Sequence, residues 1–117
     1  MPFALLIVEP PGQRESRPES EARARYDHML RFSEELKSRG LLTISQSLLS
    51  DAKAARVQVQ DHRTTVVDGP FAEAKEMVGG FFLLTCETRD QAIAIARDCP
   101  AARWATVEVR EMGPCFR

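Results

Sequence analysis

The sequence has little of what metal centres are built from. It contains two histidines and three cysteines in 117 residues, and the cysteines, Cys86, Cys99 and Cys115, are far apart with no Cys-x-x-Cys pair. A structural zinc site needs about four such ligands at short paired spacings. The glycines do not form a phosphate-binding loop, because neither Gly-x-Gly-x-x-Gly nor Gly-Lys-Ser/Thr occurs. We therefore predict no metal and no cofactor, and we expect Cys86 and Cys99 to be buried as small hydrophobic residues.

A surplus of basic charge and long apolar runs are also lacking. The formal net charge is -1, and the acidic and basic residues are mixed along the chain. This argues against direct contact with nucleic acid. No apolar run approaches the roughly 20 residues that cross a bilayer, and the apolar start at Phe3 has neither a basic region before it nor a cleavage site after it. We expect a cytoplasmic protein without membrane contact.

Length and pattern predict one α+β domain over residues 1–117. Apolar runs and alternation indicate six strands and two helices, a long helix from near Pro18 to Arg39 and a shorter one from Thr88 to just before Pro100. The predicted strands cover Phe3–Val8, Leu42–Leu48, Arg56–Gln60, Thr64–Val67, Gly80–Leu84 and Trp104–Arg110. This order predicts a ferredoxin-like βαβ repeat, of βαββββαβ type, with an inserted β-hairpin.

Two of the predicted strands, Phe3–Val8 and Gly80–Leu84, are apolar on both faces, which is typical of the central strands of a sheet. Two helices cover only one side of such a sheet. Leaving the other side in water costs about 1.5 to 3 kcal/mol for each large side chain. We therefore expect a homodimer that packs sheet face to sheet face.

The stretch from Val66 to Cys86 carries the most distinctive residues. Two turn signals, Asp68-Gly69-Pro70 and Gly79-Gly80, enclose a short charged segment that we expect on the surface. Asp68 is either a carboxylate that orients or deprotonates a ligand, or a turn former whose side chain accepts backbone N–H bonds. Phe71 is either a core or interface anchor or a stacking platform.

Residues 67–76, Val-Asp-Gly-Pro-Phe-Ala-Glu-Ala-Lys-Glu, followed by Gly79-Gly80-Phe81-Phe82, closely resemble the signature of the DGPF-type members of the YCII-related family. Further matches lie at Phe32–Leu36, Cys99–Ala102 and Val107–Arg110. The resemblance implies a ferredoxin-like fold that dimerises as an α/β barrel. It leaves function largely open, although some family members are linked to transcription-initiation sigma factors.

Related branches of that family carry a helix histidine and a later aspartate in a shared cleft. Here the corresponding helix position holds Met29, and the Asp-Pro before the last strand is Cys99-Pro100. His28 and Asp98 are each displaced by one residue. One helical position changes the direction of a side chain by about 100 degrees, so neither is expected to take over the acid/base role.

Three functions stay open. The first is a small-molecule-binding homodimer whose cleft lies between sheet and helices near Asp68, Gly69, Pro70 and Phe71, with Tyr26 and Met29 contributed by the helix. The second is an enzyme of lyase or isomerase type that uses Asp68 as its acid or base. The third is an accessory protein that docks on a transcription-related partner through a surface such as the inserted hairpin. Arg25, Arg31 and Arg103 are cations that an acidic ligand would suit, but their spacing does not require one.

Overall fold

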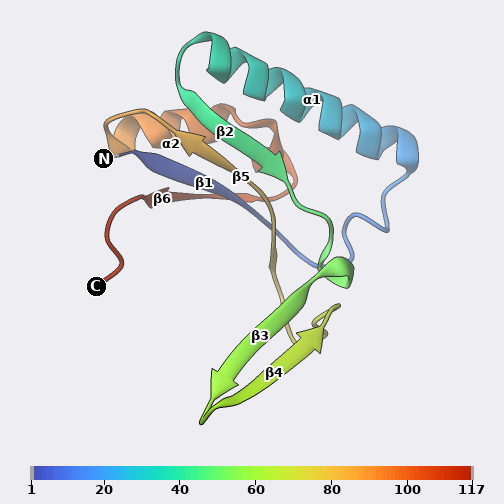
Figure 1. The fold of residues 1–117 in the computed structure, drawn as a ribbon. Coiled ribbons are helices and arrows are strands. Elements are labelled where there is room, and N and C mark those ends of the chain that lie inside the picture. The colour runs from blue at the N-terminus through green and yellow to red at the C-terminus, as the bar shows by residue number, and fades with distance from the viewer. Residues whose placement is uncertain (1, 117) are drawn as a thin grey trace.

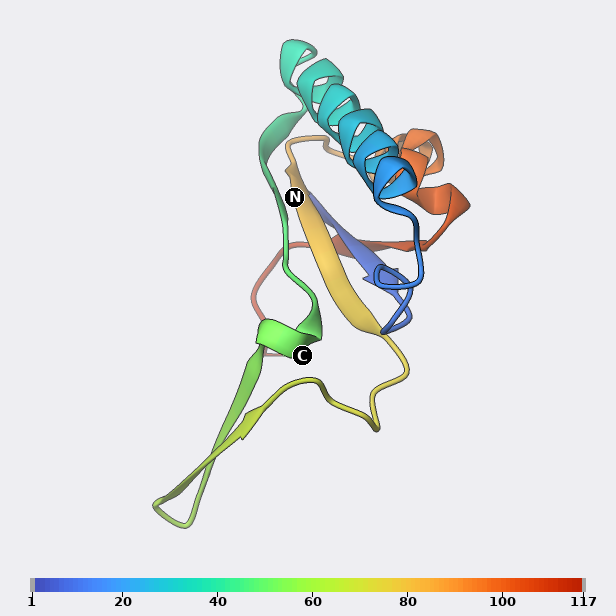
Figure 2. The ribbon, with the colours of Figure 1, turned by 90° about the vertical axis from the view of Figure 1, so that its right-hand side faces the viewer.

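The structure, a computed structural model that describes residues 2–116, has two layers, with both helices on one face of a four-stranded antiparallel sheet (Figures 1 and 2). The sheet order is β2-β5-β1-β6, and a second sheet contains only β3 and β4. This agrees with the predicted α+β, ferredoxin-like arrangement. The elements are β1 (Phe3–Glu9), α1 (Glu19–Ser38), β2 (Leu42–Ser47), η1 (Asp51–Lys53), β3 (Ala55–Gln60), β4 (Arg63–Asp68), β5 (Met77–Leu84), α2 (Arg89–Asp98), η2 (Pro100–Arg103) and β6 (Thr106–Glu111).

The core lies between the helices and the two central strands, β1 and β5, whose central position confirms the prediction from their apolar faces. Directly opposite residues of an antiparallel pair share a face, so the pair Leu5 and Phe82 points to the helices while Leu6 and Phe81 point away. Leu5, Leu36, Leu84 and Cys99 are fully buried. Cys86 is also buried, so the predicted burial of Cys86 and Cys99 is confirmed. Cys115 is exposed.

The helices begin and end within about a residue of their predicted limits, but a side chain caps only one of the two N-termini. At α2, Thr88 accepts a hydrogen bond from the backbone N–H of Gln91 at 3.2 Å. At α1, Pro18 is the N-cap residue and no side chain caps the helix. The hydroxyl of Ser16 donates to the carbonyl of Gln13 instead, because the chain makes a separate turn before the helix begins.

Gly79 and Gly80 do not form the predicted turn; both lie inside β5. A Cβ on Gly79 would collide with the Glu9 carboxylate and lie 2.6 Å from Nη2 of Arg14, and a Cβ on Gly80 would lie 2.9 Å from the carbonyl oxygen of Gln46. Glycine is therefore required by close neighbours across the sheet and not by a change of chain direction.

The inserted hairpin, β3 and β4, projects away from the main body (Figures 1 and 2). Its turn is one residue shorter than predicted, because Arg63 already belongs to β4. Asp61 and His62 form the turn with φ angles of 50° and 64°, the left-handed conformation that two-residue hairpin turns demand. Both residues lie in the connection that the sequence predicted between the two strands. Every residue of β3 and β4 is exposed in the single chain.

Candidate ligand-binding cavity

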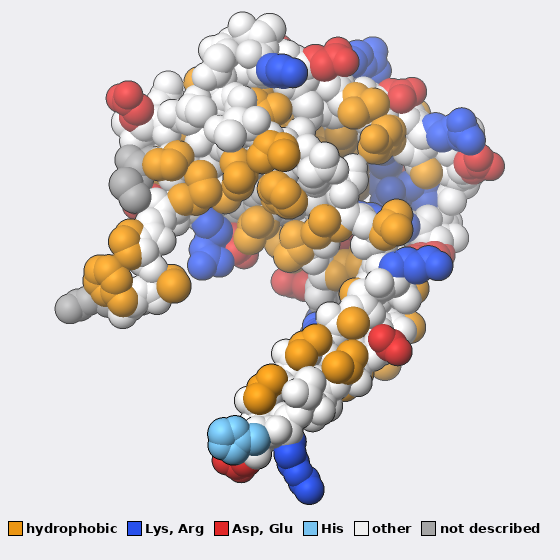
Figure 3. Space-filling model, in the orientation of Figure 1, with side chains coloured by type: hydrophobic (Ala, Val, Ile, Leu, Met, Phe, Trp, Pro, Cys, Tyr) orange, Lys and Arg blue, Asp and Glu red, His pale blue; other side chains and the backbone are white. Residues whose placement is uncertain are grey.

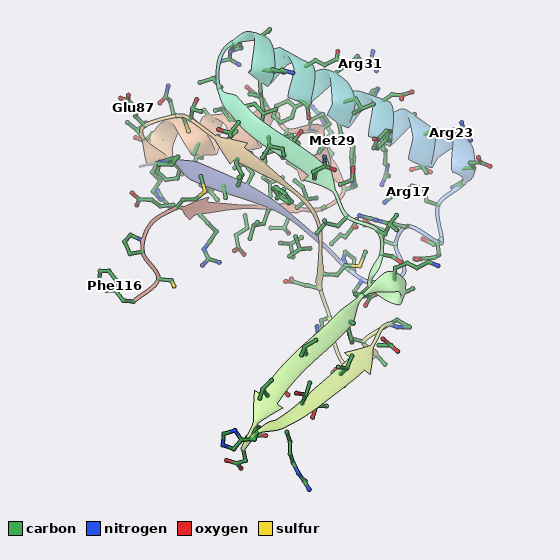
Figure 4. The ribbon with its side chains drawn as sticks, in the orientation of Figure 1. Arg17, Arg23, Met29, Arg31, Glu87 and Phe116 are labelled. Atoms are coloured by element: carbon green, nitrogen blue, oxygen red, sulfur yellow. The ribbon has the colours of Figure 1, made fainter. Side chains whose placement is uncertain are left out.

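A cavity of about 410 Å³ lies between α1 and the sheet. This volume falls within the range of small-molecule sites, about 300 to 1,000 Å³. The walls combine apolar side chains with three arginines, one carboxylate and several hydroxyls: Ile7, Glu9, Arg14, Arg17, Ala22, Arg25, Tyr26, Met29, Leu30, Ser33, Ser45, Ser47, Phe82 and Trp104, with the two glycines of β5. Figure 4 shows Met29 on the side of α1 that faces the sheet, whereas Arg23 and Arg31 lie on the outer side.

One end of the cavity is fixed by Arg14. Its Nε donates to Oε1 of Glu9 at 2.7 Å, its Nη1 to the carbonyl of Leu48 at 2.6 Å, and its Nη2 to the carbonyl of Gly79 at 3.0 Å. Glu9 is only 4% exposed, so its charge is compensated inside the protein by this ion pair. Arg14 therefore joins β1, the segment after β2, and β5 at one point.

Another wall is built around Trp104. The Nε2 of Gln13 donates to the Trp104 carbonyl at 2.9 Å, and the Oε1 of Gln13 accepts from Nη2 of Arg17 at 3.1 Å. The guanidinium carbon of Arg25 lies 4.7 Å from the centre of the Trp104 ring, a cation–π contact. Arg25 also pairs with Glu21, one turn earlier on α1, at 2.7 Å. Trp104 thus positions Arg25 directly through its ring. It positions Arg17 indirectly, because Gln13 bonds to both the Trp104 carbonyl and Arg17.

Met29 and Cys99, the two positions at which the resemblance implies a histidine and an aspartate in related branches, are neighbours in space. The Sγ of Cys99 lies 4.0 Å from the Sδ of Met29. Burial raises the pKa of the Cys99 thiol, which keeps it neutral near pH 7. A thioether and a neutral thiol therefore lie where the resemblance would place an acid/base pair. His28 is exposed on α1 and His62 is at the hairpin tip, and neither lines the cavity.

The structure divides the predicted site residues into two groups. Tyr26 and Met29 line the cavity, but Asp68, Gly69, Pro70 and Phe71 are not among the residues that line it. Asp68 is exposed at the end of β4, where it pairs with Ala55. The four loop residues lie at the base of the hairpin.

That loop is held against η1 by backbone contacts. The N–H of Gly69 donates to the Ala54 carbonyl at 2.8 Å, and the N–H of Phe71 donates to Oδ2 of Asp51 at 3.3 Å. A Cβ on Gly69 would collide with the Asp51 carbonyl. The Phe71 ring is buried and lies beneath the Arg56 guanidinium, whose central carbon is 3.9 Å from the ring centre. In the single chain, Phe71 is therefore a packing anchor.

Several cavity residues carried no signal in the sequence. Arg17 belongs to an irregular segment without periodicity, as does Gln13, which bonds to it from outside the lining, and Glu9 ends an apolar strand. Arg25 was one of three arginines noted as suitable for an acidic ligand, and it could have been singled out because it lies four positions before Met29 on the same helix. Arg31 is exposed on the outer side of α1 (Figure 4).

Within residues 2–116 the structure groups no three His, Cys, Asp or Glu side chains as a metal site would require. Neither of the two described helices has the length and apolar character needed to span a bilayer.

Comparison with known proteins gives three findings. Residues 1–114 match the family model described as the YCII-related domain. A protein of Rhizobium meliloti (strain 1021), described only as uncharacterized, is 40% identical over 67 residues, which are 56% of this chain and 54% of that protein. The match thus spans about half the length of that relative.

Among solved structures, the 5-chloro-2-hydroxyhydroquinone dehydrochlorinase of Burkholderia phenoliruptrix AC1100, in complex with 2,5-dihydroxybenzoquinone, superposes with a TM-score of 0.57. The alignment covers 97% of this chain and 94% of that chain at 17% identity. At this level of identity the likeness shows the fold alone.

Proposed function

The chain belongs to the YCII-related family, and from that premise we propose that it is a homodimeric protein that binds a small molecule between α1 and the sheet. The observation that carries this proposal is the cavity of about 410 Å³, which is lined by apolar side chains with a few polar groups. Sites for small ligands have this composition. Tyr26 and Met29 keep the ligand-binding role that the sequence predicted for them.

The loop of Asp68, Gly69, Pro70 and Phe71 has a supporting role in this proposal. The loop contacts η1 and β3. The next strand along the chain is β5, which contributes Gly79 to the cavity. A direct contact between these four residues and the ligand stays a prediction from the sequence. A transcription-related partner and a cytoplasmic location also stay predictions.

A thermal-shift screen of a metabolite library tests the proposal. Ala22 lines the cavity on α1, whereas Ala24 is exposed on the same helix, so Ala22→Trp and Ala24→Trp form a matched pair. A ligand at about 100 times its Kd adds roughly 2.7 kcal/mol, which is a shift of several degrees for a domain of this size. We expect the shift in the wild type and in Ala24→Trp but not in Ala22→Trp. A compound that shifts both variants equally would place its binding outside this cavity.

The second candidate is an enzyme of lyase or isomerase type. It is supported by the structural relative, whose name describes a dehydrochlorinase, and its acid or base would be Asp68, as the sequence predicted. The sulfur pair of Met29 and Cys99 makes binding the stronger proposal, because neither side chain transfers protons at neutral pH. The enzyme hypothesis requires that Asp68→Asn abolish turnover of a compound from the screen, and it fails if turnover is unchanged.

A further inference from the structure

We infer that the ligand is a small organic anion with a flat apolar body, and that Arg17 and Arg25 bind its anionic group. This inference rests on the proposed function and adds the chemical class of the ligand. Three features of the cavity support it: its charge, the way in which the two arginines are held, and the apolar surface beside them.

The charge of the cavity differs in sign from the charge of the chain. The whole sequence has a formal net charge of -1. The cavity is lined by three arginines and by Glu9 as its one carboxylate, so its lining has a formal charge of +2. Glu9 and Arg14 neutralise each other at 2.7 Å. The remaining positive charge of the lining is that of Arg17 and Arg25, and Arg25 also pairs at 2.7 Å with Glu21, which lies outside the lining.

Both arginines retain hydrogen-bonding capacity. A guanidinium has five N–H donors. Among the described residues, Arg17 donates to Gln13, and Arg25 pairs with Glu21 at the outer surface. Arg25 is 26% exposed at its side chain, so part of it is shielded from water, where a charge-assisted hydrogen bond to an anion is stronger.

The two guanidinium groups are also held in place before any ligand binds. Trp104 contacts Arg25 with its ring and reaches Arg17 through Gln13. Because these side chains are already ordered, a ligand loses less conformational entropy when it binds them. Arginine side chains on an open surface lack such support.

The rest of the lining selects an apolar body. Ile7, Met29 and Phe82 lie on the sheet and helix walls, and Trp104 adds an aromatic surface next to the cations. Two of the hydroxyls, Ser33 and Ser45, are 3.0 Å apart and bond to each other, which leaves fewer polar groups for a sugar-like ligand. A planar acid places its ring against the apolar walls and its anionic group at the arginines.

The test uses 2-naphthoate and 2-naphthamide, which have the same ring and differ in charge. Their Kd values are measured by NMR titration of the full chain. We expect 2-naphthoate to bind about tenfold more tightly than 2-naphthamide, which is the usual effect of one charge-assisted contact. Added salt should weaken the binding of the naphthoate and leave that of the amide unchanged.

Two pairs of variants locate the effect. Arg17→Gln and Arg25→Gln should each weaken 2-naphthoate binding severalfold without changing 2-naphthamide binding. Arg23→Gln and Arg31→Gln remove equal charge from the outer side of α1 (Figure 4) and should change neither.

If acid and amide bind the cavity equally, the inference is wrong and the proposed small-molecule site still stands. If all four arginine variants weaken 2-naphthoate binding equally, the cause is the overall positive charge around α1 and not a contact with Arg17 and Arg25. The inference is then wrong as well. If neither probe binds and the library screen is also negative, both the inference and the proposed function fail.

Discussion

Gly79 is the residue on which the geometry of one cavity wall depends. Its lack of a side chain leaves room for the Glu9 carboxylate and for the Arg14 guanidinium, which donates to the Gly79 carbonyl. The ion pair is partly buried, and a buried pair is stabilising only when its geometry and its other hydrogen bonds are intact. Gly79 thus supports a buried charge pair and, through it, the position of three chain segments.

We predict that Gly79→Ala lowers the free energy of unfolding by about 1 to 3 kcal/mol, as other overpacked sites do. The measurement is urea unfolding followed by circular dichroism. The same substitution in a Glu9→Ala/Arg14→Ala background should cost less than half as much, because the atoms that the new methyl group meets are gone. An equal cost in both backgrounds would mean that the effect comes from the strand backbone and not from the ion pair.

At the scale of helices and strands, the sequence correctly predicted the features that depend on local residue patterns. The apolarity of β1 and β5 indicated the central strands, and Thr88 with Gln91 indicated the start of α2. Gly79-Gly80 was misassigned as a turn because glycine is required there by distant neighbours, Glu9 at 70 residues from Gly79 and Gln46 at 34 residues from Gly80. Local propensity contains no information about those contacts.

The cavity was predictable only where it uses a periodic element. Tyr26 and Met29 lie on the inward stripe of α1 and were identified from it. Gln13 reaches Trp104 across 91 positions of the chain from an irregular turn and holds Arg17, and no sequence pattern marks either residue. The predicted loop residues Asp68 to Phe71 lie outside the lining, and two of them, Gly69 and Phe71, bond to η1 and the residue that follows it.

At the base of the hairpin, we predict that Phe71→Ala destabilises the protein by about 3 kcal/mol, the lower end for a buried phenylalanine. Phe71 is 7% exposed beneath Arg56, whereas Phe116 is 81% exposed near the end of the chain. Phe116→Ala is therefore the matched control and should leave the melting temperature unchanged. Similar small effects of both substitutions would show that the loop is not a packing anchor.

The shape of the whole molecule supports the proposal of a dimer. Its radius of gyration is 16.0 Å, whereas a compact domain of this length has about 13.4 Å. The excess comes with the hairpin, which extends from the body with exposed valines on both strands (Figures 1 and 3). The sheet face that points away from the helices adds half-buried or exposed apolar side chains: Leu6, Val8, Ile44, Phe81 and Leu83. Figure 3 shows apolar side chains gathered across the middle of the molecule.

We predict that the protein sediments as a dimer at micromolar concentration and that Ile44→Glu makes it monomeric, because a charge would then be buried between two sheet faces. Ile44 is 45% exposed in the single chain. Leu49, which is 77% exposed and lies beyond β2, supplies the control Leu49→Glu, which should remain dimeric. A wild-type mass equal to the 13.1 kDa of one chain would contradict the proposed dimer.

The most direct test of the ligand-binding proposal is an NMR titration of the ¹⁵N-labelled protein with the strongest compound from the thermal-shift screen. The proposal predicts that the amide signals of Ala22, Tyr26 and Met29 on α1 and of Gly79 and Gly80 on β5 shift together with a single Kd. Shifts confined to the hairpin base at residues 68–71, with the α1 and β5 signals unchanged, would contradict it.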